Sequence, residues 1–128
     1  MKPHSLQLAH LSDVHFGPAA ALEVQRCADF AAARLEASKP QAILLSGDLF
    51  DHRLEAHAPA FRAAVHWVQR LANVAPVLVL QGTFSHDVPG TLDILGALSA
   101  SYGIAVATEE GAWALNQGNQ TAAHWVAA

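Results

Sequence analysis

The segment Ala42-Ile43-Leu44-Leu45-Ser46-Gly47-Asp48 is a continuous apolar run that ends in a polar turn. Such a run, bounded by turn residues, is typical of a short strand that is buried on both faces. Similar runs lie on either side of it in the sequence, at residues 6–11 and 76–80, and each is followed by a polar loop. Residues 104–107 form one more run of this kind. The sequence therefore predicts several short parallel strands.

Amphipathic helical patterns alternate with these runs. Apolar residues recur at intervals of three and four between residues 20 and 37, where Cys27 falls on the apolar face, and again between residues 59 and 71. A shorter helix is predicted at about residues 91–99. This alternation predicts an α/β fold, with a mostly parallel sheet that is flanked by helices and covered on both faces.

The composition excludes several classes of protein. A chain of 128 residues, 52% of them hydrophobic and with a net charge of -4, fits one globular domain. A single cysteine excludes a disulfide framework, and the longest apolar stretches are far shorter than the ~20 residues of a membrane span. We read no signal peptide at the N-terminus, and we expect a cytoplasmic protein that does not associate with membranes.

One domain is expected over residues 1–128, and no linker divides it. Residues 112–115 could form one more strand, but residues 116–121 are polar and aperiodic. We therefore expect residues from about 109 to 128 to form a weakly structured tail.

Polar residues with metal-ligand character follow three of the predicted strands in turn: Asp13 and His15, then Asp48 and Asp51, then His86 and Asp87. The carboxyl ends of parallel strands meet at one edge of a sheet, where α/β proteins bind their ligands. Mixed carboxylate and imidazole groups suit manganese, iron or zinc better than calcium. The sequence thus predicts a metal site at this edge.

These segments resemble the calcineurin-like metallophosphoesterase superfamily, whose early motifs read Asp-x-His, Gly-Asp-x-x-Asp and Gly-Asn-His followed by Asp or Glu. Here the motifs stand as Asp13-Val14-His15, Gly47-Asp48-Leu49-Phe50-Asp51 and, altered, Gly82-Thr83-Phe84-Ser85-His86-Asp87. The resemblance covers about residues 6–108 and is strongest to the DNA repair exonuclease branch, the SbcD-like nuclease subunits. It implies the N-terminal half of a layered sandwich with a mostly parallel sheet flanked by helices.

The resemblance also implies metal ligands. Asp13 and His15 would bind the first ion, and Asp48 would bridge two ions. Manganese is the expected metal. The third motif lacks the asparagine that usually binds the second ion, so Ser85 or Thr83 would have to replace it. Family members supply further ligands from a later Gly-His-x-His motif, and this sequence contains none. We therefore expect at most one tight metal site.

Catalytic and binding roles follow from the same resemblance. His86 would contact the phosphate and help to protonate the leaving oxygen, with Asp87 orienting it, and His52 would contact the scissile phosphate. No residues for an organic cofactor are predicted. The implied activity is the hydrolysis of phosphodiester bonds in DNA, and the implied partner is an ATPase subunit of the SbcC type.

Two other interpretations remain open from the sequence. The chain could be a phosphatase or phosphodiesterase that acts on small molecules. Because part of the ligand set is missing, it could also be a catalytically silent binding module or a homodimerisation module.

Overall fold

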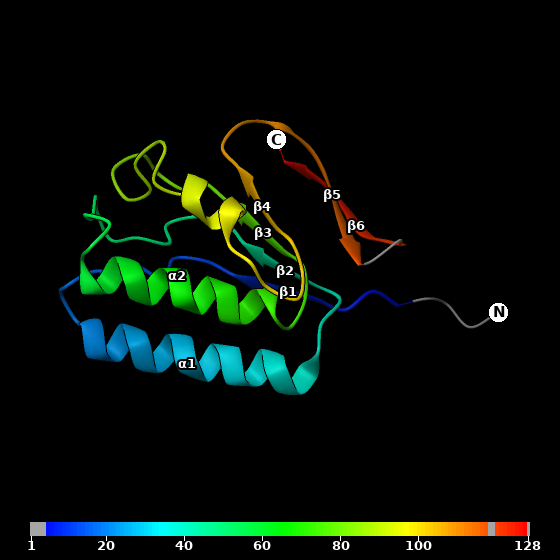
Figure 1. Ribbon diagram of the computed structural model, residues 1–128, viewed down its shortest axis with the longest axis horizontal. Helices are drawn as coiled ribbons and strands as arrows, with labels where there is room; N and C mark the ends of the chain where they lie inside the picture. Colours follow the sequence, from blue (N-terminus) through cyan, green and yellow to red (C-terminus); the bar gives the residue numbers. More distant parts are fainter. Residues whose placement is uncertain (1–4, 118–119, 128) are drawn as a thin grey trace.

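The computed structural model describes the backbone of residues 5–117 and 120–127 and the side chains of residues 5–114. Its centre is a four-stranded sheet in the order β1-β2-β3-β4 (Figure 1). All neighbouring strands are parallel, as the continuous apolar runs predict. The strands are β1 (Leu8–Leu11), β2 (Ala42–Leu45), β3 (Val77–Leu80) and β4 (Ile104–Ala107).

Three helical segments connect these strands: α1 (Ala21–Ser38), α2 (Pro59–Ala72) and the 3-10 helix η1 (Asp93–Ala97). Pro59 begins α2, where its fixed φ suits the first helical turn and its missing N–H costs no hydrogen bond. The helix predicted at residues 91–99 is shorter than expected, a single 3-10 segment. Gly96 lies within it, and glycine disfavours helix continuation.

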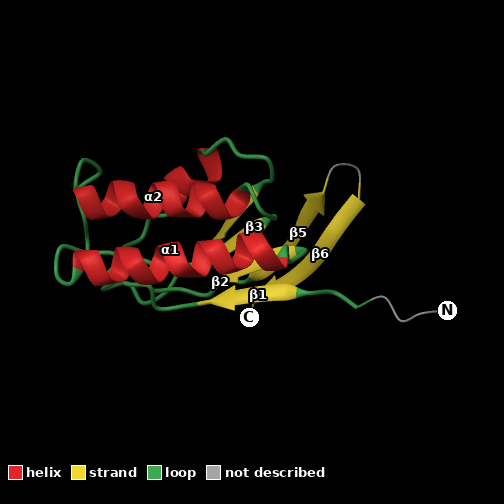
Figure 2. Cartoon of the chain, turned by 90° about the horizontal axis from the view of Figure 1, so that it is seen from below, coloured by secondary structure: helices red, strands yellow, loops and turns green. Residues whose placement is uncertain are grey.

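Both long helices lie on the same face of the sheet (Figures 1 and 2). Side chains from α1, α2 and η1 form one buried cluster with Ile43, Leu45, Val77 and Val79. Successive strands lie in chain order, and right-handed crossovers that advance in one direction leave their helices on one side. The predicted cover of this face therefore consists of helices.

The other face of the sheet carries a smaller cluster of Ala42, Leu78 and Ala107. Trp113 packs against this cluster from strand β5 (Gly111–Gln117). Thus a strand, and not a helix, begins to cover this side.

Polar contacts connect helices α1 and α2. The indole Nε1 of Trp67 donates a hydrogen bond of 2.7 Å to the carbonyl oxygen of Ala28, and both residues are buried. Arg70 donates from Nε and Nη2 to the two carboxylate oxygens of Glu36, at 2.6 and 3.1 Å. These contacts hold α1 and α2 together as the helical layer that packs on the sheet.

The chain continues beyond the sheet as an antiparallel hairpin of β5 (Gly111–Gln117) and β6 (Gln120–Ala127). The expected strand at residues 112–115 lies within β5. The weakly structured tail from about residue 109 to 128 stays a prediction. No helix within the described residues has the length and apolarity needed to cross a membrane.

Candidate metal site

The loops after β1 and β2 run side by side beyond the ends of these strands. Backbone N–H groups of Asp13 and His15 donate to the carbonyl oxygens of Gly47 and Asp48, both at 3.1 Å. A parallel bridge between Phe16 and Phe50 closes the paired segment. The sheet therefore holds the first two motifs against each other through main-chain bonds.

Asp13, His15 and Asp48 lie at the carboxyl ends of β1 and β2 and form a group that could hold a metal ion. His15 Nε2 is 3.8 Å from Asp13 Oδ1 and 4.0 Å from Asp48 Oδ2. In an extended strand, the alternation of side chains would place Asp13 and His15 on one side. The backbone instead turns left-handed at all three residues, with φ of 55°, 58° and 51°. Residues other than glycine in this region cost of order 1–3 kcal/mol each and cluster at functional sites.

The third motif approaches the second through two glycines. Gly47 has φ of 104°, and a Cβ added there would lie 2.8 Å from the Cα of Gly82. A Cβ added at Gly82 would lie 2.2 Å from both the backbone nitrogen and the Oδ1 of Asp48. The absence of side chains at both positions lets the loop after β3 reach the metal-ligand group.

Asp87 anchors this third loop from inside the protein. Its side chain is fully buried, and its two carboxylate oxygens accept hydrogen bonds from the backbone N–H groups of Phe50 and Gly82, at 3.1 and 2.9 Å. The contact predicted for Asp87 was with His86. In the structure, His86 Nδ1 instead contacts the carbonyl oxygen of Asp51. Asp87 thus joins the second and third loops.

Thr83 holds the carboxylate of Asp48. Its backbone N–H and its hydroxyl both donate to Asp48 Oδ1, at 2.7 and 3.0 Å. These bonds, the backbone bond first, lower the pKa of Asp48, and nearby His86 and His15 lower it further. Asp48 is therefore an ionised ligand candidate with one oxygen already engaged.

Ser85, predicted as the replacement metal ligand, lies beside Thr83, which itself contacts the carboxylate of Asp48. Its Oγ is 3.5 Å from the Oγ1 of Thr83, and the side chain is exposed. Of the two hydroxyls considered from the sequence, Thr83 is the one that contacts Asp48.

Asp51 contacts three histidines, which the sequence did not indicate. Its Oδ1 lies 3.4 Å from His15 Nδ1, its Oδ2 lies 3.1 Å from His52 Nδ1, and its carbonyl oxygen contacts His86. The bond from His52, followed by that from His15, lowers the pKa of Asp51. His52 itself is half exposed.

His15, Asp51 and His86 form a second group that could hold a metal ion. The rings of His15 and His86 meet edge to face, with their centroids 4.6 Å apart. His15 belongs to both groups and offers Nε2 to the first and Nδ1 to the second. The two groups therefore share one imidazole.

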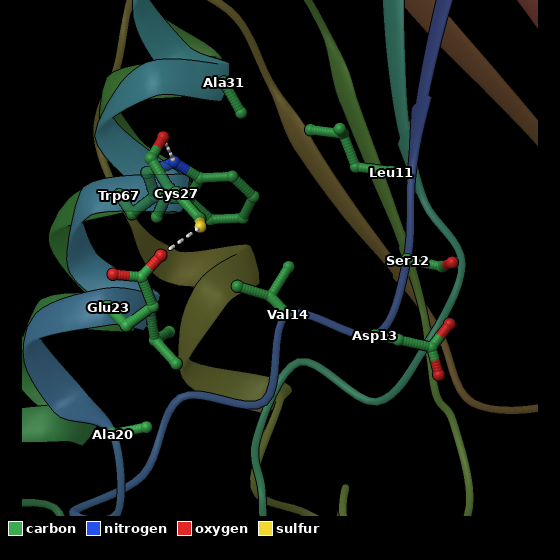
Figure 3. Close-up of a pocket in the computed structure, with 11 residues that line it drawn as sticks. Leu11, Ser12, Asp13, Val14, Ala20, Glu23, Cys27, Ala31 and Trp67 are labelled. Carbon is green, nitrogen blue, oxygen red and sulfur yellow. Dashed lines mark hydrogen bonds between the residues drawn. The ribbon is translucent and has the colours of Figure 1, made fainter.

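An apolar groove of about 340 Å³ lies beside the site, between α1 and the loop after β1. Figure 3 shows Val14 pointing toward α1, near Cys27, while the carboxylate of Asp13 points away from the helix. Of the ligand group, Asp13 lines the groove, whereas His15 and Asp48 do not. Cys27, predicted to be packed in the core, is exposed at this groove.

Comparison with known proteins shows similarity to solved structures. Neither a family profile nor a curated protein matches the chain. Among solved structures, the chain is similar to the crystal structure of the Pseudomonas putida nuclease MPE, with 27% sequence identity and a TM-score of 0.51. The match covers 84% of this chain and 50% of that one, so the chain spans about half the length of the nuclease. The parallel sheet flanked by helices is consistent with a partial metallophosphoesterase-like fold.

Proposed function

We propose that this chain carries a divalent-metal site for phosphodiester hydrolysis and that its substrate is a nucleic acid. The observation that carries the proposal is the convergence of Asp13, His15 and Asp48 on one point, each in a strained left-handed conformation. The similarity to a solved nuclease supports the choice of nucleic acid as the substrate class.

The donor set fits one transition-metal ion. Two carboxylates and one imidazole suit manganese, iron or zinc, and we propose manganese. Asp13, His15 and the Oδ2 side of Asp48 would hold the ion. Asp48 Oδ1 already accepts two hydrogen bonds from Thr83, which disfavours its use as a bridge to a second ion. A bound divalent ion would supply positive charge for the phosphate and lower the pKa of water.

Protein side chains would perform the remaining steps. His86 donates Nδ1–H to the carbonyl oxygen of Asp51, which leaves Nε2 to exchange a proton with the leaving oxygen. Asp87 fixes the loop that carries His86. His52, held by Asp51 beside this group, is the proposed phosphate contact.

The decisive experiment is manganese-dependent hydrolysis of a labelled oligonucleotide by the wild-type chain and by Asp48→Asn. We expect the substitution to abolish metal-dependent hydrolysis. Asp93→Asn serves as a matched control, because Asp93 is an exposed carboxylate in η1. Equal hydrolysis by the wild type and by Asp48→Asn would contradict the site assignment.

The same assay with other substrates, together with a measurement of metal binding, separates the two alternative functions. Hydrolysis of nucleotides or simple phosphate esters, but not of oligonucleotides, would favour a small-molecule phosphoesterase. Metal binding without hydrolysis of any phosphoester would favour a binding module. The SbcD-like branch, a role in DNA repair, a cytoplasmic location, an SbcC-type ATPase partner and a homodimer remain predictions from the sequence.

A further inference from the structure

We propose that a small pocket beside the metal site holds one unpaired nucleobase of the substrate. The pocket has a volume of about 180 Å³ and lies where β3 and β4 end. Its walls come from Leu80 and Gln81 after β3, from Ala107 and Thr108 after β4, and from Phe84. The proposal rests on the proposed function and names the part of a nucleic acid that this site would recognise.

Phe84 supplies the stacking surface. It is 69% exposed, although burial of a phenyl ring is favourable by a few kcal/mol, so its ring is available to a ligand. It follows Thr83, which holds Asp48, and precedes His86 by two residues. A base stacked on this ring would therefore belong to a nucleotide whose phosphate is close to the ligand group.

The loop around Phe84 is fixed before any ligand arrives. Backbone N–H groups of His86 and Asp87 both donate to the carbonyl oxygen of Thr83, at 3.0 and 2.8 Å. Gln81 Nε2 donates to the carbonyl oxygen of Asp87, at 2.9 Å. Because the loop is closed by these bonds, stacking on Phe84 would cost little ordering of the chain.

The charge of the pocket favours a base over a phosphate. Glu109 and Glu110 line it, and both are exposed. Two carboxylates repel a phosphate, but they accept hydrogen bonds from exocyclic amino groups such as N4 of cytosine. We therefore expect a preference for cytosine over thymine.

Stacking on a side chain requires a base that has left its own helix. Aromatic stacking platforms are the usual means of binding single strands, whereas a paired base exposes only its edges. The predicted substrate is thus single-stranded or frayed nucleic acid.

The test measures binding, without manganese, of three fluorescent eight-residue strands: oligo-dC, oligo-dT and an abasic strand with the same phosphates. We expect the wild type to bind oligo-dC about 5-fold or more tighter than the abasic strand. Phe84→Ala should remove this difference, and Phe84→Trp should retain it. Phe30→Ala is the matched control, because Phe30 in α1 is also 69% exposed.

A double substitution tests the base preference. Glu109→Gln with Glu110→Gln should reduce the preference for oligo-dC over oligo-dT and leave the difference between oligo-dC and the abasic strand. Equal binding of oligo-dC and the abasic strand by the wild type, or an unchanged difference in Phe84→Ala, would overturn the proposal. This test measures binding and is independent of the hydrolysis assay. If the chain hydrolyses oligonucleotides but shows no base-dependent binding, only the pocket proposal is refuted. Base-dependent binding without metal-dependent hydrolysis would refute only the proposed enzymatic function.

Discussion

Gly82 packs directly on the backbone of Asp48, so that the second and third motifs meet without an intervening side chain. An added Cβ would stand 2.2 Å from the Asp48 nitrogen and 2.2 Å from its Oδ1. These distances are far inside van der Waals contact, and the neighbours are backbone and a hydrogen-bonded carboxylate. The position of Asp48 therefore depends on Gly82.

Gly82→Ala should displace Asp48 and weaken both folding and metal binding. We expect the free energy of unfolding to fall by about 1–3 kcal/mol, because the clash can be relieved only by moving backbone. Chemical denaturation and calorimetric titration with manganese measure the two effects. Gly103→Ala is the control, since a Cβ there meets nothing within 4 Å. Equal stability of the two variants would refute the close contact.

Asp87→Asn should destabilise the chain although it changes the side-chain volume very little. Both oxygens of Asp87 accept backbone N–H groups in a fully buried position, and an amide NH₂ would face one of these donors. An unsatisfied buried donor costs about 1–3 kcal/mol, and more where a charged partner is lost. Thermal or urea unfolding of Asp87→Asn against Asp93→Asn measures this cost. An unchanged unfolding midpoint would show that Asp87 is not the anchor of the loop.

The chain should bind one manganese ion and not two, because His15 is common to both ligand groups. A neutral imidazole offers one lone pair, so an ion on Nε2 leaves a proton on Nδ1. Asp51 Oδ1, 3.4 Å away, is placed to accept that proton. Asp51→Ala should therefore weaken manganese binding by about 10- to 100-fold, the usual effect of losing a partner of a ligand.

Calorimetric titration gives both the stoichiometry and the affinity for this test. Asp29→Ala, which removes an exposed carboxylate in α1, should leave both unchanged. Two tight ions per chain would contradict the idea of a shared imidazole.

The ion pair between Glu36 and Arg70 should make stability depend on pH in the acidic range. The two hydrogen bonds from Arg70 lower the pKa of Glu36 below its usual value. A lowered carboxyl pKa stabilises the folded state above the pKa of the unfolded chain, and this stabilisation is lost as the pH falls through the folded pKa. NMR titration should find a depressed pKa for Glu36 that returns to the ordinary range in Arg70→Met. An ordinary pKa in the wild type would contradict the pairing.

The sequence predicted the sheet well because its signals are local. Each strand is a short apolar run with a polar turn after it, and α1 and α2 lie within a residue or so of their predicted bounds. The sequence could not predict features that depend on the arrangement of several elements. The placement of both helices on one face follows from the strand order, which no single periodicity contains.

The exposure of Cys27 also depends on how α1 packs against its neighbours. In α1 the buried positions are Ala28, Ala32 and Leu35, so the apolar stripe lies beside Cys27 and leaves it exposed.

For the site, sequence reasoning placed the three motifs at one edge of the sheet but could not assign partners between them. The bonds from Thr83 to Asp48 and the contacts of Asp51 with His15 and His86 join loops that are about 35 residues apart in the chain. Such contacts depend on how closely the loops approach, and the two glycines determine that approach.

The left-handed backbone at Asp13, His15 and Asp48 opposes stability to the proposed metal binding. Glycine adopts this conformation without strain, so glycine at any of the three positions would relieve local strain while removing a proposed ligand atom. A selection for thermal resistance alone would therefore tend to enrich chains that lack the proposed metal site. Retention of Asp, His and Asp there would be a sign that selection acts on chemistry more strongly than on folding.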